Sequence, residues 1–334
     1  MMRLDSSYKI GSGHLMRCSL LADRLKIKGH SVTFLCKNLP GNMSFLIKEK
    51  GHKVHQLNSR RLSEEIKEVS VFLRQYAPVD LLVIDHYGLD EKWESVMRPY
   101  VQKIMVIDDI ANRKHDCDIL LDQNYYKDMT ERYRGLVPVT SKILVGPDYA
   151  LLRDEFQLLK PARAKEISKV KNILVNFGGM DPMHYCLTFL NLLWGHYRQF
   201  ESYSFIFILG EKNADFEKSK LFAKKLPNCK IISSTDSMAK LMTASDLCIG
   251  SSGSTALERA CLGVASFVAV SASNQEKVAQ DGHGFYHHVL NMESDELANE
   301  ILYLISDTAY LNRLSKNAFE LLKNASVDNL VAYL

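Results

Sequence analysis

A histidine stands at the tip of a glycine-containing loop near the start of the chain, in the stretch DSSYKIGSGH that runs from Asp5 to His14. A helical spacing of leucines follows at once, and the N-terminus of a helix favours negative charge nearby. Gly11 and Gly13 let the backbone approach a ligand closely, and an imidazole there can exchange a proton near neutral pH. The stretch therefore predicts a proton-transfer site, in which Asp5 orients the His14 ring or binds polar groups of the ligand. A histidine that caps the helix or fills the core is the alternative.

Two later stretches, 176–182 and 250–258, place small residues between an apolar run and a helical pattern. Backbone N–H groups, hydroxyls and the positive end of a helix together suit a diphosphate. A plain turn or cap is the alternative at both places, and T-x-x-E at 255–258 fits a capping box, in which Glu258 serves only its own helix. The residues predicted to bind an anionic ligand are Gly178, Gly179, Met180, Ser252, Gly253, Ser254 and Thr255.

A polar triplet, Asp85-His86-Tyr87, ends the apolar run 81–84. Ligands of open parallel sheets bind at the carboxyl ends of the strands, so we expect Asp85 and Tyr87 to take part in a site. The alternatives are a structural hydrogen-bond acceptor for Asp85 and an aromatic packing role for Tyr87. The pair Asp108-Asp109 is equally compatible with a plain loop.

Several other chemistries leave no pattern in the sequence. The loop before His14 lacks the third glycine of a dinucleotide fingerprint, and no phosphate-loop lysine pattern occurs. The seven cysteines are scattered without a C-x-x-C pair, which gives no signal for zinc or a disulfide framework. The histidines at 283, 287 and 288 show no convincing metal-ligand spacing. We therefore expect neither a metal nor another cofactor.

Composition is that of an ordinary soluble protein. The 334 residues suggest about two domains, and 46% hydrophobic with 24% charged residues allows substantial cores. A net charge of +3 gives no concentrated basic face for nucleic acid. No apolar run approaches the roughly 18 residues of a membrane span, and no signal sequence is evident. Reduced thiols in a cytoplasmic protein are the simplest interpretation.

Short apolar runs alternate with amphipathic helical patterns along the whole chain, which is typical of parallel sheets covered by helices. The sequence therefore predicts two α/β, Rossmann-like doubly wound domains, whose strand-end loops face a common cleft. The expected division is an N-terminal domain over 1–153, a linker over 154–169, a second domain over 170–306 and a C-terminal helix over 307–334.

Taken together, the motifs resemble the UDP-2,4-diacetamido-2,4,6-trideoxy-β-L-altropyranose hydrolases of pseudaminic acid biosynthesis, over nearly the whole chain. The stretches that carry the resemblance are R-L-D-S-S through His14, I-D-H-Y-G at 84–88, D-D at 108–109, C-D-I-L-L at 117–121, 146–156, G-G-M-D at 178–181 and N-Q at 274–275. The resemblance implies that His14 activates a water, that Tyr87 and Asn274 position it, and that UDP leaves with inversion and without a metal.

The second half also resembles GT-B glycosyltransferases, in particular the one that forms lipid II. That resemblance implies a GT-B fold in which Glu258 holds the ribose hydroxyls, the small residues before it hold the diphosphate, and Gln275 contacts the donor. Two alternative functions stay open: a GT-B glycosyltransferase that uses a UDP-sugar, and a non-catalytic UDP-sugar-binding protein. The expected partner is the UDP-linked diacetamido sugar, and the oligomeric state is open, with a monomer favoured.

Only four residues precede Asp5, whereas the family has a longer apolar strand there. Loss of part of a central strand would leave its neighbours unpaired. The resemblance therefore implies either that the native N-terminus lies upstream of Met1, which we favour, or that a short strand suffices. In a chain that begins at Met1, His14 would be held less firmly.

Overall fold

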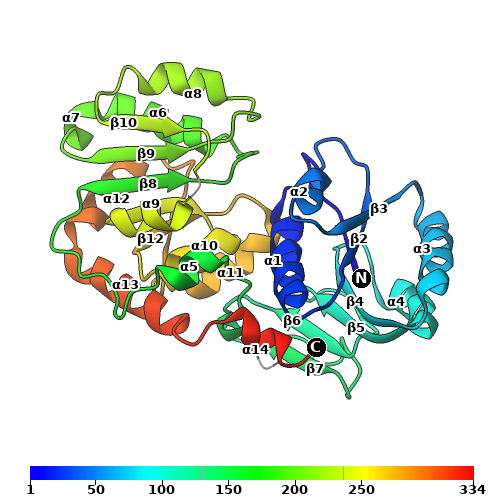
Figure 1. The fold of residues 1–334 in the computed structure, drawn as a ribbon. Helices are drawn as coiled ribbons and strands as arrows, with labels where there is room; N and C mark the ends of the chain where they lie inside the picture. The colour runs from blue at the N-terminus through cyan, green and yellow to red at the C-terminus, as the bar shows by residue number, and fades with distance from the viewer. Residues whose placement is uncertain (130, 236) are drawn as a thin grey trace. The chain divides into compact units, whose positions relative to one another are not determined.

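Two parallel β-sheets carry the fold, one in each of two units, in the computed structural model (Figure 1). The structure describes residues 1–129, 131–235 and 237–334. Unit 1 comprises Met1–Leu152 and Ala325–Leu334, and unit 2 comprises Arg153–Asn324. Each unit is an open α/β sheet with helices packed on it, so the expected fold class, two Rossmann-like doubly wound domains, is confirmed.

The sheet of unit 1 has the strand order β3-β2-β1-β4-β5-β6-β7, and every neighbouring pair is parallel. Its strands are β1 Met2–Leu4, β2 Thr33–Lys37, β3 Lys53–Leu57, β4 Val79–Asp85, β5 Val101–Ile107, β6 Ile119–Asp122 and β7 Lys142–Val145. Its helices are α1 Gly13–Ile27, α2 Ser44–Glu49, α3 Leu62–Tyr76, α4 Glu91–Met97 and α14 Val327–Val331, with short 3-10 turns η1 Arg98–Tyr100 and η2 Pro147–Tyr149.

The centre of this sheet is a strand of only three residues. β1 is fully buried and pairs on one side with β2 and on the other with β4, where Leu4 lies opposite Asp85. The chain leaves β1 toward β2 on one side and later fills the other side with β4. Strand order therefore reverses at β1 and β4, which is the position where ligands of such sheets bind.

The sheet of unit 2 has the order β10-β9-β8-β11-β12-β13, again parallel throughout. Its strands are β8 Asn172–Asn176, β9 Ser204–Ile208, β10 Cys229–Ile232, β11 Leu247–Ser251, β12 Ser266–Ala269 and β13 His288–Val289. Its helices are α5 Asp154–Leu158, α6 Tyr185–Gly195, α7 Tyr197–Phe200, α8 Phe216–Ala223, α9 Met238–Ala244, α10 Ser254–Cys261, α11 Glu276–Gly282, α12 Leu297–Ser306 and α13 Thr308–Leu321, with the 3-10 turn η3 Ser273–Gln275.

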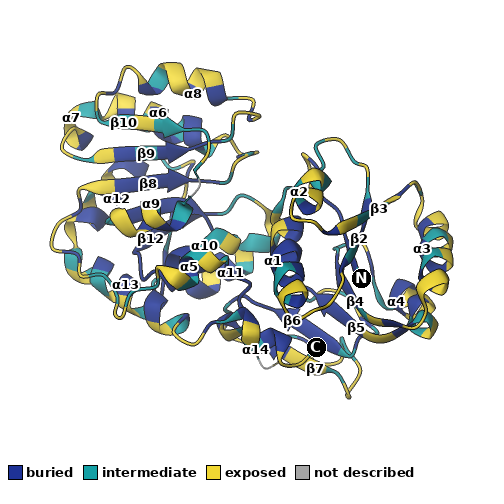
Figure 2. Cartoon of the chain, in the orientation of Figure 1, coloured by how far each residue is buried: buried dark blue, intermediate teal, exposed yellow. Residues whose placement is uncertain are grey.

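Burial is concentrated in the central strands of both sheets, such as β1, β6, β11 and β12, as the dark segments of Figure 2 show. Continuous apolar runs form the strands because a parallel sheet is covered on both faces. In unit 2, Phe189 of α6 packs edge-on against Phe205 of β9. In unit 1, Leu15 and Leu21 of α1 share a core cluster with Val83 of β4, which anchors the start of α1 over the sheet.

The structure corrects two expected segments. The proposed linker 154–169 belongs to unit 2, because Phe156 of α5 and Ile167 are buried. The proposed single helix over 307–334 is two helices: α13 packs in unit 2, whereas α14 returns to unit 1 and buries Leu330 in the core that contains α1. Within the described residues, no helix combines the length and the apolar character needed to cross a membrane.

Candidate active site

His14 occupies the first turn of α1, directly after the loop that follows β1. Gly11 adopts a φ of +81° and its N–H donates to the carbonyl of Ser7 at 2.8 Å, which closes a tight turn. That backbone conformation favours glycine because it is strained for residues with a Cβ. Gly13 is the first residue of α1, and its φ is not positive. The loop therefore holds the imidazole of His14, a buried side chain, at the carboxyl end of β1.

The Asp85 carboxylate, at the end of β4, orients the His14 ring. Its Oδ1 lies 2.6 Å from Nδ1 of His14, and Asp85 is fully buried. A carboxylate accepts a hydrogen bond from Nδ1–H, which leaves the lone pair of the neutral ring on Nε2. No described residue forms a hydrogen bond with Nε2. The pair therefore presents Nε2 as a proton acceptor, because the hydrogen bond between Asp85 and Nδ1 fixes the tautomer of the ring.

Arg17, one turn further along α1, holds this carboxylate in place. Its Nε donates to Oδ2 of Asp85 at 2.7 Å and its Nη2 to Oδ1 at 2.5 Å. Burial by itself raises the pKa of Asp85, but the Arg17 and His14 charges and their hydrogen bonds outweigh it and hold that pKa well below the usual range. Asp85 is therefore a permanent anion. Nη2 of Arg17 also lies 3.2 Å from Nδ1 of His14, but the contact of Nδ1 with Asp85 is much shorter, so the Nδ1–H tautomer of neutral His14 is favoured.

Tyr87 and Asp109 complete the group. The Tyr87 ring meets the His14 ring edge-on, with centroids 4.7 Å apart. Burial raises the pKa of Tyr87, and the nearby charge of Asp109 and a hydrogen bond to it raise the pKa further, so the phenol stays protonated. Asp109 also accepts from Nη1 of Arg17 at 3.0 Å. The structure thus brings His14, Asp85 and Tyr87 together, and side chains of these types can orient a water molecule and accept its proton.

Asp5 is not the residue that orients His14. Both its oxygens accept from Nη1 and Nη2 of Arg3, at 2.7 and 2.9 Å, and Oδ1 also accepts the backbone N–H of Lys37. Nε2 of His86 lies 3.3 Å from Oδ2. Asp5 is buried, and these donors make it an anchor between β1 and β2. The expected roles of Asp5 in orienting His14 or binding the ligand are therefore corrected.

Asp85 was expected to contact the substrate, and the structure gives it another task. A fully buried carboxylate that already serves His14 and Arg17 has no exposed surface for a ligand. Sequence reasoning missed Arg17 as a member of the site, and it left Asp109 open between a site residue and part of a plain loop. The i, i+3 spacing of His14 and Arg17 on one helix face was the available signal.

In unit 2, the loop after β8 exposes backbone toward its carboxyl end. Gly178 has a φ of +97°, and a Cβ added at Gly178 or Gly179 would meet no atom within 4 Å. The carbonyl of Met180 accepts from the Asn213 side chain. Asp181 caps α6, since its oxygens accept the N–H groups of Tyr185 and Cys186 at 3.1 and 2.7 Å. The loop therefore has room for a ligand beside the two glycines.

The turn between β11 and α10 lies beside that loop. A Cβ on Gly250 would come within 2.1 Å of the Asn176 carbonyl oxygen, so only glycine allows β11 and β8 to approach so closely here. Gly253 is the N-cap residue of α10, and the helix begins without a side-chain cap. Ser254 is exposed and Thr255 half-buried, which leaves their hydroxyls accessible. This is the arrangement expected of an anion-binding helix start.

Gln275 turns its amide nitrogen toward the same turn. Its Oε1 accepts three hydrogen bonds, from the hydroxyl of Ser252 at 3.2 Å and from the N–H and hydroxyl of Ser271 at 3.1 Å each. Its Nε2 lies next to Gly253. With the oxygen already engaged, the amide can only donate outward. Asn274 precedes it in η3 of unit 2, whereas His14 and Tyr87 belong to unit 1.

The capping box proposed for Glu258 is wrong. α10 starts two residues earlier than that box requires, with Gly253 and not Thr255 as its N-cap, and Glu258 instead forms a bidentate pair with Arg153, from Nε at 2.7 Å and Nη2 at 3.0 Å. Arg153 also contacts Glu155 at 2.8 Å. Burial raises the pKa of Glu258 even though the Arg153 hydrogen bond and charge lower it. A carboxylate has about four lone-pair positions, so two acceptor positions stay free for a diol.

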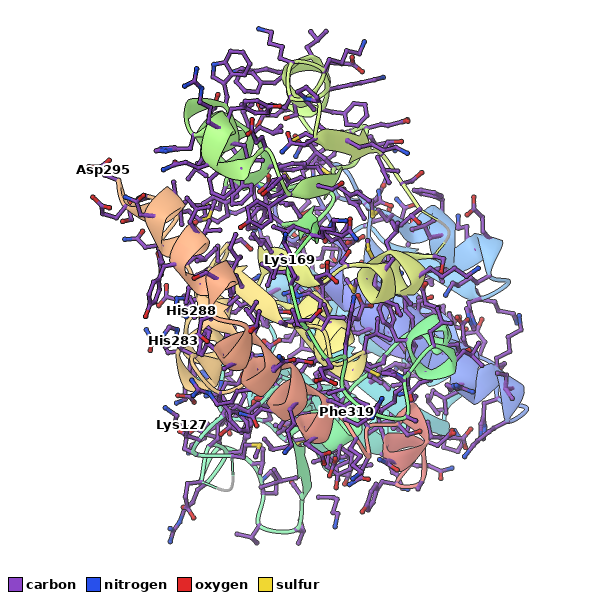
Figure 3. The ribbon with its side chains drawn as sticks, turned by 90° about the vertical axis from the view of Figure 1, so that its left-hand side faces the viewer. Lys127, Lys169, His283, His288, Asp295 and Phe319 are labelled. Carbon is purple, nitrogen blue, oxygen red and sulfur yellow. The ribbon has the colours of Figure 1, made fainter. Side chains whose placement is uncertain are left out.

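The histidines near the end of unit 2 serve the fold. His283 and His288 lie side by side (Figure 3), with ring centroids 4.7 Å apart. His288 forms hydrogen bonds with the Tyr310 hydroxyl at 2.8 Å and with Glu300 at 3.0 Å. Within the described part of the chain, no group of three or more His, Cys, Asp or Glu side chains is arranged to hold a metal ion.

The comparison with known proteins places this chain in a family. The UDP-2,4-diacetamido-2,4,6-trideoxy-beta-L-altropyranose hydrolase of Campylobacter jejuni is 32% identical over 280 residues, which are 83% of this chain and 93% of that protein. The chain belongs to this hydrolase family. The spore coat polysaccharide biosynthesis protein SpsG of Bacillus subtilis, at 25% identity, matches 83% of this chain and 78% of its own length.

Other likenesses of this hydrolase-family member concern the fold. The Glycosyltransferase family 28 C-terminal domain matches residues 188–330. Acinetobacter baumannii MurG superposes with a TM-score of 0.65 at 14% identity, over 99% of this chain and 98% of that one. The S. aureus MnaA–UDP structure gives 0.66 at 11% identity, over 99% and 94%. At such identities the likeness shows the GT-B-like fold alone.

Proposed function

We propose that this protein hydrolyses a UDP-2,4-diacetamido-2,4,6-trideoxyhexose to UDP and the free sugar, with inversion at the anomeric carbon. In this proposal His14 is the general base, Tyr87 and Asn274 help to position the water, and unit 2 holds the nucleotide. The supporting observation is the Asp85–His14 pair, which leaves Nε2 as an unengaged acceptor. The substrate class comes from the name of the Campylobacter jejuni relative.

The reaction balances with these groups alone. The water oxygen bonds to the anomeric carbon while its proton passes to Nε2 of His14. The bond from that carbon to the diphosphate oxygen breaks, and UDP leaves with the electron pair. The carbon gains oxocarbenium character as the bond lengthens, so correct orientation of the water matters more than its strong activation as a nucleophile. Attack opposite the leaving group inverts the configuration. His14 then returns its proton to solvent.

The nucleotide half supplies stabilisation of charge. In our proposal the N–H groups of Gly253, Ser254 and Thr255 and the hydroxyls of Ser254 and Thr255 bind the diphosphate, with backbone at Gly178, Gly179 and Met180 beside them. Ser252, which the sequence also predicted to bind, is buried and supports the turn, because its N–H donates to the Ala269 carbonyl and its hydroxyl to Gln275. Preorganised donors aimed at a leaving group's growing charge are an effective source of rate enhancement. Glu258 would accept the ribose hydroxyls and Gln275 would donate through its amide. Gly11 and Gly13 would shape the backbone around the sugar.

A glycosyltransferase is the second candidate, because residues 188–330 match a glycosyltransferase family. Such an enzyme would share the nucleotide half but would transfer the sugar to an acceptor hydroxyl instead of water. The Asp85–His14 pair could deprotonate either nucleophile, so only an experiment with and without an acceptor separates the two.

The test is incubation with a panel of UDP-2,4-diacetamido sugars and no acceptor. Our proposal expects release of UDP and the free sugar, with the product anomer read by NMR at early times showing inversion. UDP-N-acetylglucosamine serves as the control donor, because it lacks the second acetamido group. Absence of UDP release from every donor, with turnover restored by an added acceptor, would favour the glycosyltransferase.

A further inference from the structure

A buried arginine lies directly under the turn that begins α10. Arg259 is 1% exposed. Its Nη2 donates to the Ser251 carbonyl at 2.7 Å and its Nη1 to the Thr255 hydroxyl oxygen at 3.3 Å. Its Nε is buried and has no hydrogen-bond partner. No carboxylate of the described residues lies within ion-pair distance of it.

A buried guanidinium without a paired anion is costly for the folded protein. Burial indeed lowers the pKa of Arg259, although an arginine in a protein stays protonated. The neighbouring carboxylate of Glu258 is already engaged by both nitrogens of Arg153. The positive charge under the turn therefore feels the Glu258 carboxylate but has no ion-pair partner of its own among the described residues, which is a cost that a ligand's negative charge would offset.

The same contacts change what the turn presents on its outer side. The Ser251 carbonyl is turned inward and occupied by Arg259. The Thr255 hydroxyl oxygen accepts from Arg259, so its own proton is available to donate elsewhere. The Gln275 oxygen is likewise occupied by Ser252 and Ser271. What is left facing outward are donors, at the positive end of an eight-residue helix.

We propose that Arg259 is a positioning residue that makes this turn selective for a diphosphate, whose two phosphates each carry negative charge. It does not touch the ligand; it adds a positive charge beneath the turn and polarises the Thr255 hydroxyl outward. The inference rests on the proposed function, because it assigns the diphosphate of UDP to this turn. It predicts that the contribution of Arg259 to binding is confined to the phosphates.

The test is calorimetric titration of UDP and of uridine into the full-length wild type, R259Q and R259K. Glutamine keeps a neutral amide donor but carries no charge. We expect R259Q to weaken UDP binding by roughly tenfold to fiftyfold, as for removal of one charge from a poorly screened site, and to leave uridine binding unchanged. R259K should retain most of the UDP affinity. The melting temperature of ligand-free R259Q should be equal to or above that of the wild type.

A merely structural arginine would behave differently. R259Q would then lower the melting temperature of the ligand-free protein. It would also either weaken the binding of UDP and uridine equally or leave both unchanged. Each of these results would overturn the proposal. If R259Q does not fold, T255V is the second test, because it removes the half-exposed hydroxyl that accepts from Arg259. We expect a roughly threefold to tenfold loss of affinity for UDP and no loss for uridine. Unchanged UDP affinity of T255V would overturn it. A wild type that binds no UDP would instead contradict the proposed function itself.

Discussion

The two units place their candidate groups at equivalent positions of similar sheets and fill those positions with different chemistry. In each unit strand order reverses beside a central strand, at β1 and β4 in one and at β8 and β11 in the other. Unit 1 has ionised side chains locked together there, with Arg17 between two carboxylates. Unit 2 has a glycine- and serine-rich turn whose outward groups are neutral donors.

The difference teaches that topology decides where a site lies and side chains decide what it does. A network of buried charges sets one protonation state and one ring orientation, which suits a proton acceptor. A turn of backbone and hydroxyl donors suits an anionic ligand that binds and dissociates in each reaction cycle. The predictions below test this division, since unit 1 variants should alter turnover and unit 2 variants should alter nucleotide binding.

The largest expected effect is that of His14→Ala or His14→Asn. Removal of the proposed general base should lower turnover by about 10²–10⁴-fold while UDP still binds, because the residues proposed to hold the nucleotide belong to unit 2. UDP release and calorimetric UDP titration measure the two quantities separately. His30→Asn, at an exposed histidine of the same unit, is the control. Near-normal hydrolysis by His14→Ala would remove His14 as the base.

Asp85→Asn should have a smaller effect of the same kind. An amide no longer fixes the Nδ1–H tautomer, so in part of the molecules the ring presents Nε2–H to the water instead of a lone pair. We expect kcat to fall and its pH profile to shift, with UDP affinity unchanged. Steady-state kinetics over a pH series provide the measurement. A loss confined to UDP affinity would break the proposed division between the units.

Glu258→Gln should alter binding instead. Loss of two charge-assisted hydrogen bonds to ribose hydroxyls would weaken UDP by about tenfold or more. 2′-Deoxy-UDP, which lacks one hydroxyl, should lose less affinity on the same substitution, and calorimetry compares the two ligands. Equal losses for both would leave Glu258 with its Arg153 pairing as its only role.

A pH-dependent stability should trace to unit 1. Burial, and next the charge of Asp109, raise the pKa of Asp122 to about 7, despite the Tyr133 hydrogen bond and the nearby Arg132. A carboxyl with a raised folded-state pKa stabilises the protein at low pH and loses that contribution as pH rises through about 7. Asp122→Asn should therefore flatten the decline of the melting temperature between about pH 4 and 7. An unchanged slope in thermal denaturation would contradict this assignment.

The smallest expected effect is none at all. Treatment with EDTA should leave the rate of UDP release unchanged, because the proposed reaction uses an imidazole as base and protein donors for the diphosphate. The rate is measured before and after chelation, with added Mg²⁺ as the reverse control. A strong loss that Mg²⁺ restores would require a metal-dependent mechanism.

Much of the fold could be predicted because it depends on local patterns. The alternation of apolar runs with helical patterns predicted two domains built on parallel sheets, and the structure has a parallel sheet in each of its two units. Patterns of this kind do not show where an element packs. The segment 154–169 looked like a linker because of its charges, and the separate docking of α13 and α14 depends on which core each one meets.

What the sequence by itself determined is the order of elements and the loops in which the polar and glycine residues lie, since both depend on neighbours within a few positions. Only the tertiary structure decided which of those residues serve each other. Asp85 lies 71 residues from His14, Arg17 lies 68 from Asp85, and Arg153 lies 105 from Glu258. The structure therefore shows that Asp85, and not Asp5, orients the His14 ring. It also shows that Glu258 forms a partly buried ion pair with Arg153 and not the capping box that was the alternative to ribose binding, because contacts between distant strands and helices are set by packing.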